Sequence, residues 1–227
     1  MNILHPRVYV SVLVLALLLI IPLTAGSPFV YHLFILICSY AALASAWNIV
    51  GGFAGQLSLG HAVFYGVGAY TTTLLINLGI SPWIGMFVGA ILSSAVAVVI
   101  SWPCFRLRGP FFALATIAVL EVVRLMAINQ HDVTGGAAGL GVPLKLGVEW
   151  MLFRPRWPYL LIAFGFLIIT LAVSWKIKNS RLGYYLIAVR EREDAAHAVG
   201  VNSVKVKLIA VILSAFLTSL VGSFHAM

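Results

Sequence analysis

Long apolar blocks separated by short polar breaks make up most of the chain. The blocks run for roughly 18 residues or more, the length that an α-helix needs to cross the ~30 Å hydrocarbon core of a bilayer. The pattern therefore predicts an all-α fold, a polytopic transmembrane helical bundle with about seven spans. The expected spans are roughly 8–25, 29–49, 59–78, 82–102, 110–128, 157–175 and 208–226.

The first and last blocks bear on the two ends of the chain. The first follows a single basic residue, Arg7, and has a long apolar core, which favours a retained anchor over a cleaved signal peptide. The last ends at Met227 with no polar flank. We therefore expect one transmembrane domain over 1–227 that lacks C-terminal spans. A short protein with an odd number of spans is the alternative.

Composition supports the membrane class. Hydrophobic residues make up 62% of the chain and charged residues 9%, whereas a soluble domain carries about 25% charged residues. The formal charge of +8 does not indicate a nucleic-acid partner, because half of the 14 Lys and Arg lie between 176 and 207, flanked by apolar blocks. Cytoplasmic loops of membrane proteins have this character. Cys38 and Cys104 lie in or beside apolar blocks and imply neither a disulfide nor a metal site.

The distribution of Lys and Arg predicts an orientation. Ten of them fall on one set of alternating loops and three on the other, and the richer side is expected to be cytoplasmic. The N-terminus and the segments 50–58, 103–109 and 176–207 would then face the cytoplasm, and 129–156 the outside.

One charged pair is expected inside a span. Arg124 follows Glu121 by three residues, so the two side chains can form an intramembrane ion pair along one helix face. A structural or snorkelling pair is favoured over a direct substrate contact.

A Gly-rich segment at 48–61 is the most distinctive part of the sequence. Four glycines in the ten residues from Gly51 to Gly60 are expected to break any helix there. Non-helical backbone at membrane depth is tolerated only where protein buries it or water lines it. The segment is therefore a candidate wall of a solute pathway, and a flexible cytoplasmic turn is the alternative. The candidate pathway residues are Asn48, Gln56, Ser58, His61, Tyr65 and Tyr70.

A short helix is predicted within the basic segment 176–207. Acidic residues including Glu193 and Asp194 precede an alanine-rich stretch, and Gly200 follows it, which are helix start and stop signals. Asn202 or Ser203 would then cap the next helix. These residues alone favour an ordinary solvated loop helix.

The sequence resembles the branched-chain amino acid permeases of ATP-binding-cassette importers. The resemblance covers 48–74, the run Arg106-Leu107-Arg108-Gly109-Pro110-Phe111-Phe112-Ala113-Leu114-Ala115-Thr116, then Thr134-Gly135-Gly136, Gly139-Leu140 and the loop 181–201. In that loop, Asp194-Ala195-Ala196, three residues and Gly200 are similar to the fingerprint Glu-Ala-Ala-x-x-x-Gly of importer permeases. Asp replaces Glu here, and the Leu-Pro of the wider fingerprint is absent.

This resemblance implies a permease subunit that translocates branched-chain amino acids across the bacterial inner membrane by alternating access. It implies a cytoplasmic coupling loop over 176–207, in which Asp194, Ala195, Ala196 and Gly200 dock on an ATPase. The implied partners are ABC ATPase subunits, a second homologous permease subunit forming a dimer, an extracytoplasmic solute-binding protein and the lipid bilayer. The sequence contains no Gly-Lys-Ser or Gly-Lys-Thr, so ATP is expected on the partner subunits and no cofactor on this chain.

Other functions remain as alternatives. The nearest is an ABC permease for urea or short amides, sugars or nucleosides. An intramembrane enzyme could use His61 or Glu121, but it lacks a second catalytic group at a definable spacing, so no catalytic residue is expected. The six histidines have no metal-site spacing, so no metal is expected. A membrane scaffold would not explain the clustering of polar residues and glycines at 48–73.

Overall fold

The computed structural model describes residues 6–105, 107, 109–143 and 147–227. A helix lies at each of the seven positions expected from the apolar blocks, and the described ranges contain no β-strand beyond an isolated bridge between Gly147 and Leu152. The expected all-α helical bundle is confirmed. The long helices are α1 (Pro6–Ala25), α2 (Pro28–Asn48), α3 (His61–Asn77), α4 (Pro82–Cys104), α5 (Pro110–Asn129), α7 (Trp157–Lys178) and α10 (Ser203–His225).

Five helices of the described part are long and apolar enough to cross a bilayer. They are α4, α5, α7, α10 and α2 together with η1 (Ile49–Phe53), a π-helical turn that extends it. The apolar stretch Leu13–Ala25 of α1 is shorter. Helix α3 has 17 residues, or roughly 26 Å at 1.5 Å per residue, slightly less than the bilayer core. The structure thus supports five full-length spans where we expected about seven.

The remaining elements are short and lie between the long helices. They are α6 (His131–Thr134), η2 (Gly136–Ala138), η3 (Val148–Trp150), α8 (Arg181–Glu191) and α9 (Glu193–Ala198). Proline occupies the first turn of α2, α4, α5 and α7. Proline is favoured there because the first backbone N–H groups of a helix have no partner within the helix.

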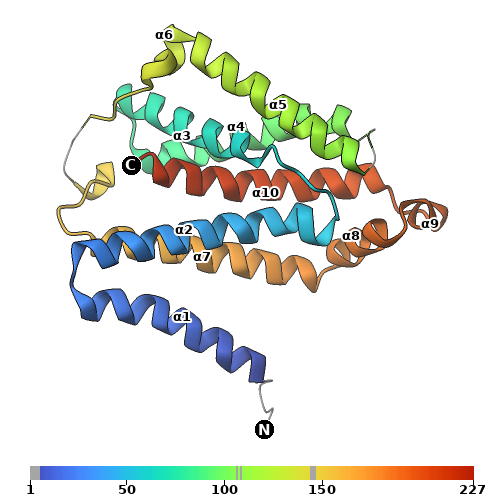
Figure 1. Ribbon diagram of the computed structural model, residues 1–227, viewed down its shortest axis with the longest axis horizontal. Helices are drawn as coiled ribbons and strands as arrows, with labels where there is room; N and C mark the ends of the chain where they lie inside the picture. The colour runs from blue at the N-terminus through green and yellow to red at the C-terminus, as the bar shows by residue number, and fades with distance from the viewer. Residues whose placement is uncertain (1–5, 106, 108, 144–146) are drawn as a thin grey trace.

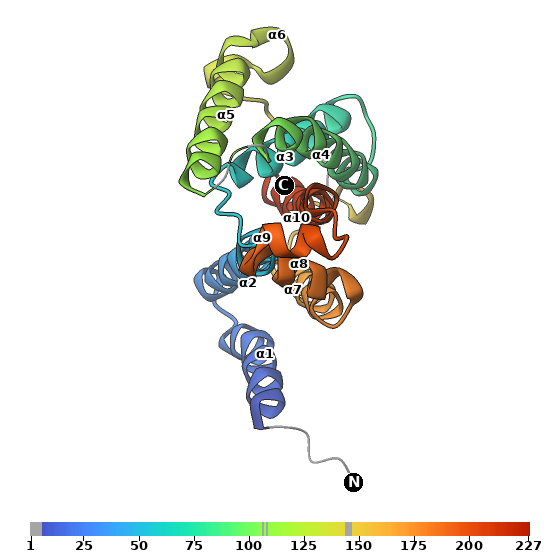
Figure 2. The same cartoon turned by 90° about the vertical axis from the view of Figure 1, so that its right-hand side faces the viewer.

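The bundle is layered around α10. Figures 1 and 2 show α10 between the pair α2–α7 and the pair α3–α4, with α5 outside α3 and α4 and with α1 outside α2 and α7. Helix α10 is the most buried of the spanning helices. It supplies residues to all three apolar core clusters of the described structure, among them Val221, Ala215 and Ala210. The centre of the bundle is therefore built on α10.

Glycines bring α3 and α10 into close backbone contact. A Cβ atom on Gly68 of α3 would collide with the backbone of Ser219, and one on Gly222 of α10 would collide with the carbonyl of Tyr65. Gly89 of α4 in turn lies against Gly68. Small residues allow such approach between membrane helices, where packing replaces the hydrophobic effect as the source of association.

The loops are sorted to opposite ends of the bundle. Helices α8 and α9 lie at one end, and α6 lies at the other, near the C-terminus (Figure 1). Two basic residues that contribute to the expected orientation, Arg106 and Arg108, lie outside the described residues, as does Lys145. The segments expected on the two sides of the membrane are thus at opposite ends.

The outer surface of the bundle is apolar. On α5, large side chains such as Phe111, Leu114 and Met126 are more than half exposed, and Ile91 and Val99 of α4 are exposed in the same way. A soluble monomer rarely exposes so much contiguous apolar surface. Together with the five spanning helices, this surface identifies a multi-pass membrane protein.

Candidate functional site

The Gly-rich segment starts as a continuation of α2. Residues 49–53 form the π-helical turn η1, and the regular helix is lost only from Ala54 onward. Gly51 and Gly52 lie inside this turn, where Cβ atoms would collide with the ring of Trp47 and the side chain of Asn48. The break therefore begins later than the glycines predicted. Single π-helical turns are frequent at functional sites.

The irregular stretch from Ala54 to Gly60 is held in place by hydrogen bonds to neighbouring elements. The indole Nε1 of Trp47 donates to the carbonyl of Ser58 at 2.7 Å, and the amide of Leu59 donates to Thr116 Oγ1 at 3.1 Å. These bonds satisfy backbone groups that neither helix nor sheet pairs. The stretch is thus held between α2 and α5 rather than forming a loose turn.

His61 stands at the start of α3 and connects this stretch to α10. Its Nδ1 lies 2.9 Å from Ser58 Oγ and its Nε2 lies 2.8 Å from Ser214 Oγ. Ser214 donates its only hydroxyl hydrogen to the carbonyl of Ala46, at 2.7 Å. The neutral imidazole must then donate from Nε2 to Ser214 and accept at Nδ1 from Ser58. The ring links α2, α3 and α10 through one chain of hydrogen bonds.

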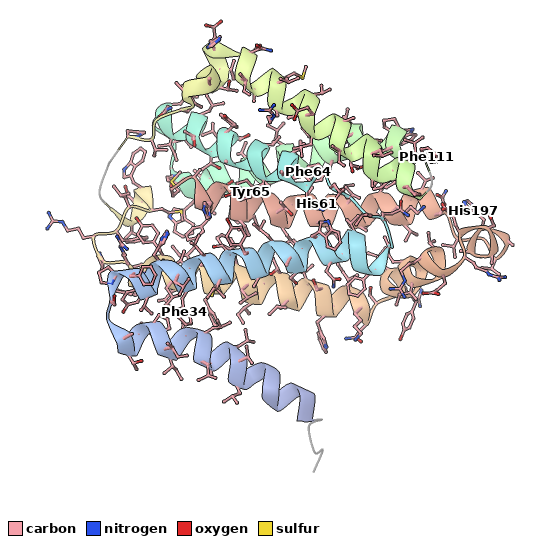
Figure 3. The ribbon with its side chains drawn as sticks, viewed as in Figure 1. Phe34, His61, Phe64, Tyr65, Phe111 and His197 are labelled. Atoms are coloured by element: carbon pink, nitrogen blue, oxygen red, sulfur yellow. The ribbon has the colours of Figure 1, made fainter. Side chains whose placement is uncertain are left out.

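A cavity of about 540 Å³ opens beside this network, between α2, α3 and α10. This volume lies within the range of small-ligand sites. Figure 3 places His61 and Tyr65 of α3 in the middle of the bundle, where the cavity lies. None of the described residues that line it is charged. The lining residues are Tyr40, Leu43, Ala44, Trp47, His61, Ala62, Tyr65 and Thr218.

The structure brings together part of the predicted pathway set. His61 and Tyr65 line the cavity, and Ser58 orients His61. Gln56 lines a separate hollow of about 470 Å³ against α5. Asn48 is exposed and packs on Gly52, outside the cavity lining.

The residues that line the cavity differ from the predicted pathway residues at four further positions. Tyr70 is half-buried on α3 and does not line the cavity. Sequence reasoning missed Tyr40, Trp47 and Thr218, which do line it. Trp47 precedes Asn48 directly, so the polar segment marked its neighbourhood, whereas Thr218 sits in an apolar block without a local signal.

The basic segment 176–207 contains two helices. Helix α9 begins at Glu193 and ends at Ala198, and Gly200 has a φ of +88°, as the predicted start and stop signals required. Asn202 caps α10 by accepting from the amide of Lys205 at 3.0 Å, which confirms that prediction. Helix α8 was not predicted.

Helix α9 exposes most of the residues that resemble the family fingerprint. Asp194, Ala195 and Gly200 are exposed, whereas Ala196 is buried. The neighbouring Val199 is 79% exposed. The surface of α9 is therefore accessible to another protein.

Side-chain bonds hold α9 against the start of α10. Lys207 Nζ lies 2.8 Å from Glu193 Oε1, and the Lys207 side chain is 4% exposed while that of Glu193 is 25% exposed. His197 Nε2 lies 2.8 Å from Ser203 Oγ. A buried charge requires its partner, so Lys207 ties the position of α9 to that of α10.

Arg190 connects α8 to the π-helical turn. Its Nη1 donates to the carbonyl of Gly52 at 2.9 Å, while Glu191 Oε1 accepts from its Nε at 3.1 Å and its Nη2 at 2.7 Å. Gly55, with a φ of +65°, lies beneath the Arg190 stem, and a Cβ atom there would collide with it. The loop helices and the Gly-rich segment are therefore in direct contact.

Glu121 and Arg124 form a two-bond ion pair on α5. Arg124 Nε donates to Oε2 at 2.9 Å and Nη2 to Oε1 at 2.5 Å. Both side chains are more than half exposed, and neither lines the cavity. Among the residues that the structure describes, no three His, Cys, Asp or Glu side chains cluster to hold a metal ion.

Comparison with known families and proteins gives consistent matches. Residues 29–227 match the family model of the branched-chain amino acid transport system / permease component. The high-affinity branched-chain amino acid transport system permease protein LivM of Salmonella typhimurium is 29% identical over 212 aligned positions, covering 82% of this chain and 50% of that protein. The LivM protein of Escherichia coli matches to the same extent.

A third relative is more distant. The probable branched-chain amino acid transport permease protein LivM of Methanocaldococcus jannaschii is 22% identical over 196 positions, covering 78% of this chain and 55% of that protein. The chain thus spans about half the length of the curated relatives it matches. No solved structure matches it. Because the family model covers the chain from the start of α2 to its last residue, the chain belongs to the family of branched-chain amino acid transport system permease components.

Proposed function

We propose that this chain is the membrane-spanning permease subunit of an ATP-binding-cassette importer. It translocates branched-chain amino acids across the bacterial inner membrane by alternating access, and separate ATPase subunits supply the energy. Family membership and the multi-pass helical fold support this function. The α8–α9 end and the N-terminus face the cytoplasm, where the ATPase binds.

The exposed and anchored α9 carries the proposal. Its residues Asp194 and Ala195 are exposed, and Gly200 lies just beyond its end, so a partner protein can bind this short helix. The buried contact between Lys207 and Glu193 anchors α9 to α10. A helix that is exposed on one side and anchored on the other can transmit a displacement from an ATPase into the bundle.

The contact between α8 and η1 gives this displacement a route to the cavity. Arg190 holds the carbonyl of Gly52, and the stretch that follows runs through Ser58 to His61. Movement of α8 would shift this stretch and with it the wall formed by α3. Coupling through packed and hydrogen-bonded elements of this kind requires two discrete arrangements of the wall, which we identify with the inward-open and outward-open states.

We assign the remaining partners to other surfaces of the bundle. A second permease subunit closes the open side of the cavity between α2, α3 and α10. The segment from α6 to η3, at the end opposite α9, receives the extracytoplasmic solute-binding protein. ATP is bound by the partner subunits and not by this chain.

A co-purification experiment tests the docking role of α9. The chain is co-expressed with candidate ABC ATPase subunits, and the amount of ATPase retained is measured for wild type and for Asp194→Lys, Ala195→Trp and Gly200→Trp. Ala195→Trp adds bulk at an exposed site without the backbone strain that Gly200→Trp brings, since Gly200 has a positive φ. We expect the affinity for the ATPase to fall at least about tenfold in each variant, which corresponds to a loss of about 1.4 kcal/mol or more of binding free energy.

Matched substitutions at the opposite end serve as controls. Glu149→Lys and Val148→Trp make similar changes at exposed positions of η3 and should leave ATPase binding unchanged. Wild-type chain that binds no ATPase, or α9 variants that bind like the controls, would overturn the docking role. Competition by unlabelled leucine, urea and ribose for uptake of labelled leucine tests the substrate, and only leucine is expected to compete.

A further inference from the structure

Two polar side chains at the wall of the cavity, those of Trp47 and His61, are already engaged by the protein. The Trp47 indole nitrogen donates to Ser58, and both ring nitrogens of His61 are bonded to serine hydroxyls. These side chains therefore build the wall, and a ligand would have to break their bonds to use them.

Thr218 differs from these residues. It lines the cavity from α10, it is 3% exposed, and its hydroxyl has no hydrogen-bond partner in the described structure. Thr116 and Thr170 show how membrane helices usually satisfy such a group, because each donates to the carbonyl three residues earlier, at 2.8 and 2.9 Å. Buried hydroxyls without a partner are unfavourable, and an exception needs an explanation.

A change of side-chain rotamer can turn this hydroxyl toward the cavity. The Oγ1 and Cγ2 atoms of threonine occupy alternative staggered positions about χ1. Rotation about χ1 by about 120° therefore moves the hydroxyl to a position that the methyl group or the hydrogen occupied before. Tyr65 and Tyr40 line the same space with further phenol groups.

The rest of the lining defines the chemistry of the occupant. Leu43, Ala44 and Ala62 offer aliphatic contacts, and the lining described above contains no charged side chain. Such a space suits a small molecule with an aliphatic body and a compact polar end that hydroxyl groups bind.

We infer that an aliphatic amino acid binds in the cavity between α2, α3 and α10, and that the Thr218 hydroxyl determines specificity by hydrogen bonding to its amino or carboxylate group. The aliphatic side chain lies against Leu43, Ala44 and Ala62. This inference rests on the proposed function and adds to it the site and the residue that recognises the solute.

Uptake kinetics of the reconstituted importer test the inference. Thr218→Val removes the hydroxyl while keeping the shape, and Thr218→Ser keeps the hydroxyl. The control is Thr72→Val on α3, because the Thr72 hydroxyl is also buried and without a partner but does not line the cavity. We expect Thr218→Val to raise the KM for leucine about tenfold with ATPase binding unchanged, and both other variants to stay within about threefold of wild type.

Two analogues of leucine identify the group that is bound. 3-Methylbutylamine lacks the carboxylate and 4-methylpentanoate lacks the amino group. The analogue that retains the bonded group should inhibit leucine uptake by the wild-type importer. Its inhibition constant should rise about tenfold in Thr218→Val. Either identity supports the inference.

Three results would overturn the inference. The first is a KM of Thr218→Val equal to that of wild type, and the second is an equal change of KM in Thr72→Val. The third is a loss of ATPase assembly in Thr218→Val with an unchanged KM, because this result would assign Thr218 to helix packing. Thr218→Ala, which removes the hydroxyl with less bulk, replaces Thr218→Val if that variant is not produced. Wild-type importer that takes up no leucine would instead contradict the proposed function itself.

Discussion

Arg190 Nη1 donates a hydrogen bond to the carbonyl oxygen of Gly52 across a distance of 2.9 Å, joining two residues 138 positions apart in the chain. The guanidinium is held in place by Glu191, and Gly55 leaves room for its stem. This contact joins the candidate ATPase-docking segment to the candidate pathway segment.

Substitution of Arg190 should uncouple ATP hydrolysis from transport. In Arg190→Gln we expect ATPase binding and hydrolysis to persist while leucine uptake falls about fivefold or more, because a charge-assisted bond to Gly52 worth about 1–3 kcal/mol is lost. The ratio of leucine transported to ATP hydrolysed measures this effect. Arg192→Gln, at an exposed neighbouring position, is the control. An unchanged ratio in Arg190→Gln would exclude this coupling route.

Substitution by alanine should affect the stability of the bundle differently at Gly68 and at Gly66. Gly68→Ala places a Cβ atom against Ser219 of α10 and should destabilise the bundle by about 1–3 kcal/mol. Gly66→Ala on the same helix meets no atom within 4 Å and should be neutral or slightly stabilising. The midpoint of thermal unfolding in detergent measures both. Equal midpoints would show that the contact of α3 with α10 is looser than described.

The positions of the long helices could be predicted because the length of an apolar block is itself the physical requirement for spanning a bilayer. The Glu121–Arg124 pair could be predicted for a similar reason, since residues three apart share a helix face. Helix α8 was missed although Leu182, Leu186 and Val189 follow helical spacing and face inward. Its charged residues instead favoured a solvated cytoplasmic loop at these positions.

The cavity could not be predicted from local pattern. Tyr40 and Thr218 lie far apart in sequence, and each is an ordinary member of an apolar block. The same holds for Lys207 and Glu193, which belong to different helices. Which residues meet in these places depends on the packing of α2, α3 and α10, and no periodicity within one helix specifies that packing.

Loss of the Lys207 charge should release α9 from α10. Lys207→Met leaves Glu193 without this partner and should weaken docking of α9 by about 2 kcal/mol, less than for a fully buried pair because Glu193 is partly exposed. Hydrogen–deuterium exchange of the α9 amides should then become about 10-fold faster or more. Lys205→Met, at an exposed position two residues earlier, should leave exchange unchanged. Equal exchange in both variants would contradict the anchoring role of Lys207.

Cysteine labelling tests the orientation in the membrane. Val148→Cys in η3 should react with a membrane-impermeant maleimide added to intact cells, and Lys178→Cys at the other end of α7 should react only after permeabilisation. The native Cys38 and Cys104 are buried, so background labelling should be low. The reverse pattern would invert the orientation and place α9 on the wrong side for an ATPase.

ATP-dependent uptake of labelled leucine into proteoliposomes tests the central claim most directly. The vesicles contain this chain with its ATPase subunits and second permease subunit, and the solute-binding protein is added on the receptor side. We predict uptake that requires ATP and that falls to background with Asp194→Lys, while Asn77→Lys, at the exposed C-terminal end of α3, transports like wild type. Leucine uptake that proceeds without ATP, or that is the same in Asp194→Lys as in wild type, would contradict an ATP-driven permease coupled through α9.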